Sequence, residues 1–256
     1  MSTGLKRIKS QDIRINIKEI DTIIFPDSCI LILASLIVIL TMIFILNKTN
    51  TIANSFLAEL RDANIQQDKS RFRRNQEKLG EILAYEISKT LKYAEREIQT
   101  PLGIATVSLH DEEPVLCTIL RAGLPFHQGF MNYFDKSPSA FVTAYRKVKK
   151  NGTFIINVDH ISAPDIDNKT LIICDSMLAT GQSIVQVCKE LIATYAIKEI
   201  HIAAIIASAE GVAHVRANLP KARLWLCAVD EEMTSKAYIV PGLGDAGDLA
   251  FGEKML

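Results

Sequence analysis

Apolar residues gather in short runs along the chain from residue 115 onward, and these runs predict buried strands. The runs cover residues 115–120, 140–145, 170–174, 200–207 and 222–229. Two further segments, 183–196 and 209–219, carry apolar residues every three or four positions, which predicts helices. Strands that are apolar throughout and alternate with helices are typical of a mostly parallel sheet covered on both faces. We therefore expect an α/β fold.

Two other regions of the chain have a different pattern. Residues 47–70 are polar and helix-prone, and a helix is expected over 71–92 because one of its faces is apolar. The residues of that face are Phe72, Leu79, Ile82, Leu83, Ile87 and Leu91. Residues 153–158 are a short β-prone run within the polar stretch 147–168, which predicts a hairpin that serves as a flap.

Residues 29–46 contain no charged side chain and are just long enough to span a membrane. The segment before them is long and of mixed charge, which is unlike a secretory signal. A second interpretation makes 42–46 the first strand of the globular domain, leaving 29–41 too short to span. We expect an N-terminal extension over 1–41, read as an upstream extension or a loosely attached helix, and a domain over 42–256. Membrane attachment through 29–46 is the alternative.

Charge and cysteine content narrow the class of protein. The 29 Lys and Arg residues balance 29 Asp and Glu residues, and this neutrality argues against nucleic acid as a partner. The five cysteines are widely spaced and form no CxxC pair, which disfavours a disulfide framework or a zinc site. A reducing, cytoplasmic location is expected.

The segment 171–184 carries the clearest chemistry. An apolar strand leads into Asp175, followed by a turn of small residues and a helix. Ligands of parallel sheets bind where strands end, and main-chain amides at the start of a helix favour a phosphate. The pattern predicts a phosphate turn over 179–183, with Asp175 suited to vicinal hydroxyls or hydrated Mg²⁺. For this segment alone, a purely structural role for Asp175 and Gly181 stays open.

Four segments together resemble the type I phosphoribosyltransferases and, among these, the uracil phosphoribosyltransferases. The turn reads DSMLATGQS, close to the family's DPMLATGGS. The other segments are ILRAGL at 119–124, AYR at 144–146 and YIVPGLGDAGD at 238–248. The resemblance covers 42–256, including LRD at 60–62 and RFRRN at 71–75. It implies a phosphoribosyltransferase-type parallel sheet with helices on both faces, a hood formed by the termini and a β-hairpin flap.

The resemblance implies a glycosyltransferase that converts uracil and 5-phospho-α-D-ribose 1-diphosphate (PRPP) into UMP and diphosphate, a step of pyrimidine salvage. Mg²⁺ is the implied cofactor, carried by PRPP and bridged through water to Asp175 or Asp245 rather than ligated directly. The resemblance also implies a homo-oligomer, either a dimer or a tetramer, and it suggests GTP as an effector. The GLGDAG string at 242–247 fits a dinucleotide-binding pattern, but only nine residues follow it, too few for a Rossmann unit.

The same resemblance assigns residues by position. PRPP is expected to contact Arg121, Arg146, Asp175, Ser176, Met177, Leu178, Ala179, Thr180, Gly181, Gln182, Ser183 and Asp245. Uracil is expected to contact Ile239, Gly244, Asp245 and Ala246, largely through main-chain groups. The implied catalytic residues are Arg146, Asp175 and Asp245. Paired guanidinium hydrogen bonds suit a diphosphate leaving group.

Two residues depart from the family pattern. Ser176 stands in place of a usual Pro, and Gln182 in place of a usual Gly. If position 182 needs a positive φ, a side chain there costs about 1 kcal/mol. This motivates an alternative function, a weak or inactive regulator that binds PRPP or a nucleotide. His127 is expected to be a satisfied structural residue rather than an acid or base, and Cys174 a small strand residue rather than a nucleophile.

Overall fold

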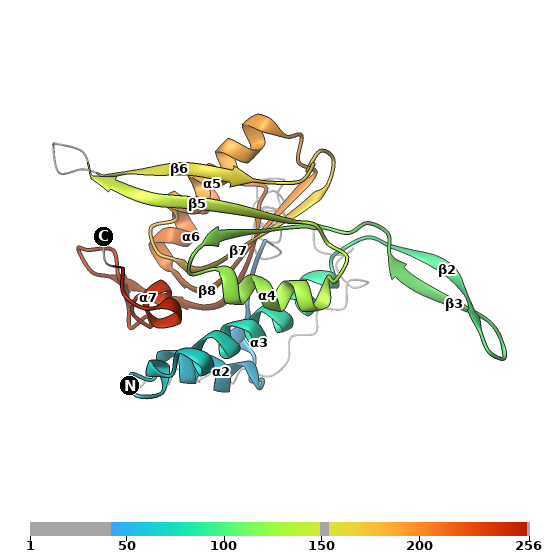
Figure 1. Ribbon diagram of the computed structural model, residues 1–256, viewed down its shortest axis with the longest axis horizontal. Helices are drawn as coiled ribbons and strands as arrows, with labels where there is room; N and C mark the ends of the chain where they lie inside the picture. The colour runs from blue at the N-terminus through green and yellow to red at the C-terminus, as the bar shows by residue number, and fades with distance from the viewer. Residues whose placement is uncertain (1–41, 149–153, 255–256) are drawn as a thin grey trace, which may run out of the picture. The chain divides into compact units, whose positions relative to one another are not determined.

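The computed structural model describes residues 42–148 and 154–254, and a seven-stranded sheet organises them (Figure 1). The strand order is β1-β9-β8-β7-β4-β5-β6. The strands are β1 (Ile43–Ile45), β4 (Val115–Leu120), β5 (Ser139–Val148), β6 (Phe154–Ser162), β7 (Thr170–Leu178), β8 (Glu199–Ser208) and β9 (Arg223–Asp230). Neighbours pair in parallel except β6, which is antiparallel to β5. The predicted sheet is confirmed.

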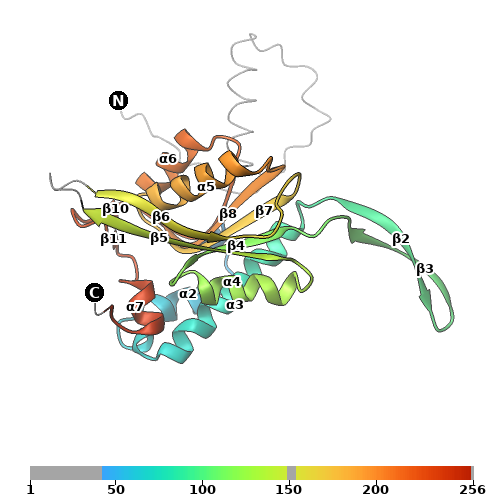
Figure 2. The same ribbon diagram turned by 45° about the horizontal axis from the view of Figure 1, so that its top comes forward.

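Helices cover both faces of this sheet, as Figure 2 shows. One face carries α2 (Ala53–Arg61), α3 (Lys69–Ser88) and α4 (Leu124–Tyr133), and the other carries α5 (Gln182–Thr194) and α6 (Ala209–Asn218). Neighbouring residues of β7 enter opposite layers: Ile172 packs with the first group and Ile173 with the second. Each strand is therefore apolar throughout because both of its faces are buried.

The predicted helix over 71–92 is confirmed with different ends. It begins at Lys69, because the Asp68 side chain accepts hydrogen bonds from the amides of Ser70 and Arg71. It ends at Ser88, ahead of the strand that begins at Tyr93. Four residues of the expected apolar face, Phe72, Leu79, Leu83 and Ile87, are fully buried.

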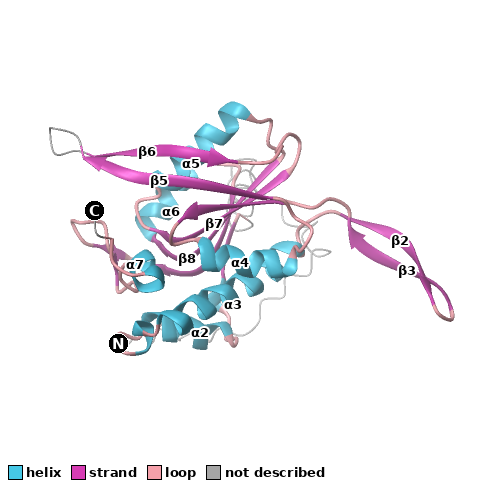
Figure 3. Cartoon of the chain, in the orientation of Figure 1, coloured by secondary structure: helices cyan, strands magenta, loops and turns pink. Residues whose placement is uncertain are grey.

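An exposed hairpin and α4 were not anticipated. β2 (Tyr93–Thr100) and β3 (Gly103–His110) form an antiparallel pair that projects away from the sheet (Figures 1 and 3). Its exposed apolar side chains are Tyr93, Ile98, Leu102, Ile104, Val107 and Leu109. The hairpin has no buried face, so it leaves no alternating pattern in the sequence.

Short elements near the two ends of the described chain lie outside the seven-stranded sheet, and the hood expected from these segments stays a prediction. They are η2 (Leu46–Lys48), η3 (Ile65–Gln67), β10 (Glu232–Met233), β11 (Ile239–Val240) and α7 (Ala246–Phe251). The Arg73 side chain of α3 donates to the carbonyl of Ala250 in α7 (2.6 Å), which joins the last of these elements to α3.

The structure shows where two predicted strands, β1 and β7, begin and end. Residues 43–45 pair with β9, which confirms the interpretation of 42–46 as the first strand. β7 does not stop at Cys174 as predicted but continues to Leu178, because Asp175, Met177 and Leu178 pair with β8. The expected flap has its strands in β5 and β6, while residues 149–153 between them lie outside the described residues.

The membrane interpretation concerns residues that the structure describes only in part. Residues 29–41 of the apolar run lie outside the described residues. In the ranges 42–148 and 154–254, none of the helices has the length and apolarity that crossing a membrane requires.

Candidate active site

The turn between β7 and α5 surrounds a small cavity of about 40 Å³. Its lining contains seven of the predicted PRPP residues, namely Asp175, Met177, Leu178, Ala179, Thr180, Gly181 and Ser183, together with Ile184. Gly181 precedes α5 with φ of +73°, and a Cβ there would lie 2.8 Å from the carbonyl oxygen of Gly211. Gly181, which precedes α5, has no side chain to cap the helix, and the amide of Gln182 makes only a long hydrogen bond to Thr180 Oγ1 (3.4 Å), so the amides at the start of α5 can turn to an anion.

The turn is supported from α6. Ser208 Oγ donates to the carbonyl of Ala179 (2.6 Å) and accepts from the amide of Gly211 (2.8 Å). The hydroxyl of Ser208 thus joins the turn to the start of α6. This support fixes the main chain around which a phosphate would be held.

Gln182 does not place a side chain at a strained position. It is the first residue of α5 and is exposed, while the positive φ falls on Gly181. The cost expected for a side chain at position 182 therefore does not arise, and the motivation for an inactive protein loses its main support.

Neither of the two residues that depart from the family pattern, Ser176 and Gln182, lines the cavity. The Ser176 side chain is fully buried, and its Oγ has no hydrogen-bond partner among the described residues. Successive strand residues face opposite sides, so Ser176 points away from the side that Asp175 occupies. A role of Ser176 or Gln182 in binding PRPP stays a prediction that concerns their main-chain groups.

Asp175 has an unusual affinity for its proton. Burial raises the pKa of its carboxyl to about 7, although the amides of Met177 and Ser176 donate to it and oppose the shift. A carboxyl that titrates near neutral pH beside a phosphate turn is typical of a functional site.

The segment that the resemblance assigns to uracil forms a tight loop between β11 and α7. Asp245 Oδ1 accepts from the amides of Gly247 (2.9 Å) and Asp248 (3.0 Å), so Asp245 caps α7. The side chains of Ile239 and Ala246 are buried, whereas Gly244 is exposed. The loop can therefore offer mainly main-chain donors and acceptors to a flat ligand.

Arg121 joins the end of β4 to α7, the helix that follows this loop. Its Nη2 donates to Asp248 Oδ1 (3.2 Å) and to the carbonyl of Gly252 (3.3 Å), and its side chain is 43% exposed. Arg121, which is expected to bind diphosphate, therefore lies beside the helix that directly follows the predicted base loop. Arg146 lies on β5 opposite Ile156, and nothing is described of its side chain.

His127 and Cys174 are both buried. Burial lowers the pKa of His127 to about 4, and its ring packs edge-on against Phe141 with ring centroids 5.6 Å apart. The expectation that it is satisfied was wrong, because neither ring nitrogen has a partner within the described part of the chain. Burial also raises the pKa of the Cys174 thiol, which agrees with a structural role.

The phosphate turn offers a carboxylate, that of Asp175, to a Mg²⁺ ion that a substrate would bring. Among the described residues, no three His, Cys, Asp or Glu side chains gather into a metal-binding group. A single carboxylate at the phosphate turn, Asp175, suits a contact through metal-bound water.

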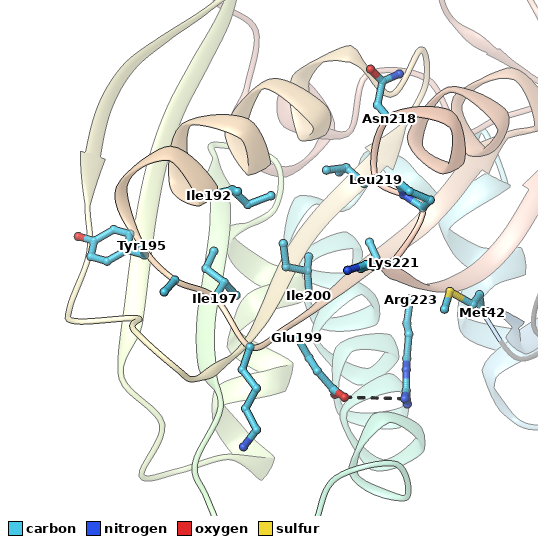
Figure 4. Close-up of a pocket in the computed structure, with 14 residues that line it drawn as sticks. Met42, Ile192, Tyr195, Ile197, Glu199, Ile200, Asn218, Leu219, Lys221 and Arg223 are labelled. Atoms are coloured by element: carbon cyan, nitrogen blue, oxygen red, sulfur yellow. Dashed lines mark ion pairs between the residues drawn. The ribbon is translucent and has the colours of Figure 1, made fainter.

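A larger hollow of about 680 Å³ lies at the opposite edge of the sheet, where β8 and β9 begin (Figure 4). Its lining includes Met42, Ile192 and the pair Glu199 and Arg223, whose Oε1 and Nη2 atoms are 4.0 Å apart. None of the predicted site residues lines it. It is therefore separate from the candidate active site.

Sequence reasoning missed two residues that support the base loop, Arg61 and Asp230. Arg61 Nη1 lies 2.7 Å from Asp230 Oδ2, and both side chains bond to Gly242. Asp230 directly follows the predicted strand 222–229, as Asp175 follows 170–174, and this repeated strand-end acid was the available signal.

Comparisons with known proteins agree with this geometry. A family model described as uracil phosphoribosyltransferase matches residues 47–253. A uracil phosphoribosyltransferase of Porphyromonas gingivalis is 50% identical over 211 residues, covering 82% of this chain and 98% of the relative. One from Methanothermobacter thermautotrophicus is 40% identical over 187 residues, covering 72% and 85%. The solved AQ2163 protein of Aquifex aeolicus superposes with a TM-score of 0.74 at 26% identity, covering 84% of this chain and all of that one.

Proposed function

Because this chain belongs to the uracil phosphoribosyltransferase family, we propose that it transfers the phosphoribosyl group of PRPP to N1 of uracil. The bond from the anomeric carbon to diphosphate breaks, the bond to N1 forms, and the N1 proton is lost. The products are UMP and diphosphate, as expected of a pyrimidine salvage enzyme. The observation that carries this proposal is that Arg121 and the phosphate turn follow two neighbouring parallel strands, β4 and β7, while Arg121 also bonds to Asp248 in α7, the helix that follows the base loop.

Departure of diphosphate is the demanding step, since positive charge develops on the sugar as negative charge leaves. Arg121 and Arg146 would meet the leaving diphosphate with paired hydrogen bonds. Mg²⁺, when bound with PRPP, supplies further positive charge at the diphosphate. The flap strands β5, which carries Arg146, and β6 would cover the donor and exclude water.

The turn at 179–183 would hold the 5′-phosphate through the first amides of α5. Asp175 lines the same cavity, and its carboxylate can accept hydrogen bonds from the two ribose hydroxyls. Asp245, which lies directly before α7, would contact PRPP through water or Mg²⁺. When the 5′-phosphate and the diphosphate of PRPP are both held, its anomeric carbon has a defined position. Such positioning supplies a large part of the rate enhancement in a reaction of this kind.

Uracil would be read by the main chain of Ile239, Gly244 and Ala246. The O2, N3 and O4 edge of uracil offers an acceptor, a donor and an acceptor in turn. Cytosine reverses the polarity at C4 and would leave buried peptide groups unpaired.

We further propose that the protein is a homo-oligomer, a dimer or a tetramer, in which β2 and β3 contact a second copy. A lone two-stranded hairpin is marginally stable in water, and this one exposes Leu102 completely and Ile104 to 67%. Sedimentation should give a mass above that of one 28.4 kDa chain, and Leu102→Asp with Ile104→Asp should lower it. A wild type that sediments as a monomer would contradict the oligomer.

The function is tested with the full chain, Mg²⁺, PRPP and a panel of bases, with the nucleotides separated by chromatography. UMP from uracil alone is the expected result, and GTP is added in parallel to test it as an effector. PRPP binding without any product would favour the alternative, a regulator of the same fold. Product from another base would reject uracil specificity.

A further inference from the structure

Arg61 and Asp230 together hold the main chain of Gly242, at the centre of the loop after β11. Arg61 Nη1 and Nη2 donate to Asp230 Oδ2 (2.7 Å) and Oδ1 (2.8 Å). The same Nη1 donates to the carbonyl of Gly242 (2.9 Å), and the amide of Gly242 donates to Asp230 Oδ2 (2.9 Å). One ion pair therefore binds both polar groups of a single residue.

This pair differs from a solvated surface contact. Asp230 is 8% exposed and Arg61 23%. Burial by itself raises the pKa of Asp230, but the hydrogen bonds from Arg61 and Gly242 outweigh it, so the pKa lies below its ordinary value. The carboxylate is thus charged at neutral pH, and its bidentate partner gives the contact a defined geometry.

The neighbouring residues of the loop are held as well. Gly242 has φ of +56°, and a Cβ there would lie 2.2 Å from the carbonyl oxygen of Ile239. The Gln66 side chain, oriented with its nitrogen toward the loop, donates to the carbonyls of Leu60 and Leu243 (both 2.9 Å). The loop is therefore held from α2 and η3 up to Leu243, and Gly244 follows directly.

We propose that Arg61 and Asp230 are positioning residues for base recognition, which set the main-chain groups of 244–246 against the edge of the base. This inference rests on the proposed function. Peptide groups discriminate between a carbonyl and an amino group only when they cannot turn to suit either one. A loop released from Gly242 would also have to be ordered at each binding event, at a cost in affinity.

The test is steady-state kinetics on the full chain, comparing the wild type with Arg61→Ala, Arg61→Lys and Asp230→Asn. We expect the KM for uracil to rise about tenfold while the KM for PRPP changes less than about twofold. Preference for uracil over cytosine should fall in the same variants. Combining Arg61→Ala with Asp230→Asn should add little to either change, because both side chains act through Gly242.

Arg71→Ala is the matched control. Arg71 makes the same kind of bidentate pair with Glu59 of α2 (2.9 and 2.8 Å), and among the described residues it bonds to no part of 239–246. Its KM for uracil should match the wild type. Arg61→Lys keeps the charge beside Asp230, so the test does not depend on the folding of Arg61→Ala.

Equal rises in both KM values, or an unchanged KM for uracil in Arg61→Lys and Asp230→Asn, would overturn the inference. A wild type that forms no UMP would instead count against the proposed function. The two failures are therefore distinguishable.

Discussion

Arg121 Nη2 lies 3.2 Å from Asp248 Oδ1, so the arginine expected to bind diphosphate is already paired with the helix that follows the base loop. Both side chains are partly exposed, and pairs of this kind contribute at most about 1 kcal/mol. Diphosphate, with its greater charge, can therefore displace Asp248 from Arg121.

Arg121→Ala should raise the KM for PRPP by about tenfold or more, because the variant loses a charged hydrogen-bond donor to the leaving group. The KM for uracil should change little. Initial rates at varied PRPP measure this directly. Lys198→Ala removes an ion-paired cation at the far edge of the sheet and is the control. Equal effects of the two substitutions would remove the role given to Arg121.

Arg146→Ala should depress kcat far more than it weakens uracil binding, since the guanidinium is needed when the diphosphate carries developing charge. A loss of about 100-fold in kcat matches the removal of one such group. Single-turnover rates and uracil binding by calorimetry measure the two quantities separately. Wild-type turnover in this variant would contradict the assignment.

Asp175→Asn should make the ligand-free protein more stable at neutral pH. The carboxyl has a pKa of about 7 when folded and near 3.8 otherwise, so ionising it costs stability. The stability that the protonated Asp175 carboxyl contributes to the folded protein is fully present below about pH 4 and is lost as the pH rises through 7. The advantage of the variant should therefore grow over this range, to at most about 4 kcal/mol. Urea unfolding between pH 4.5 and 8 measures it, and a difference that does not vary with pH would refute the raised pKa.

Gln182→Gly should leave the KM for PRPP within about twofold of the wild type, because position 182 is an exposed helical residue. Glycine there should cost about 0.5–1 kcal/mol of stability. Gly181→Gln is the matched opposite: it places a side chain at a positive φ and against the Gly211 carbonyl, and should abolish PRPP binding. Tighter PRPP binding by Gln182→Gly would show that the family's glycine is needed.

A chain that begins at Met42 should keep the kcat and both KM values of the full chain, because β1 starts at Ile43 and the family model starts at residue 47. Parallel assays of the two chains measure this. Loss of activity in a folded short chain would assign a role to residues 1–41.

Much of the sheet could be predicted from the sequence because burial on both faces leaves continuous apolar runs. β4 was predicted with both ends correct, and β8 and β9 within one residue at each end. β7 was ended too early because Asp175 and Ser176 are polar, although the strand continues past them. The hairpin of β2 and β3 was missed, since pairing between two exposed strands imposes no apolar period.

The sequence by itself determined most strands of the central sheet, the helices α3, α5 and α6, the phosphate turn and the list of candidate ligands, since these depend on residues close together in the chain. The tertiary structure decided which of them meet. Asp175 lines the cavity while Ser176 is buried, because strand residues alternate between faces. Arg61 reaches Asp230 across 169 residues and Gly242 across 181. Such contacts leave no local period, because they arise only when the packed sheet brings distant segments to one edge.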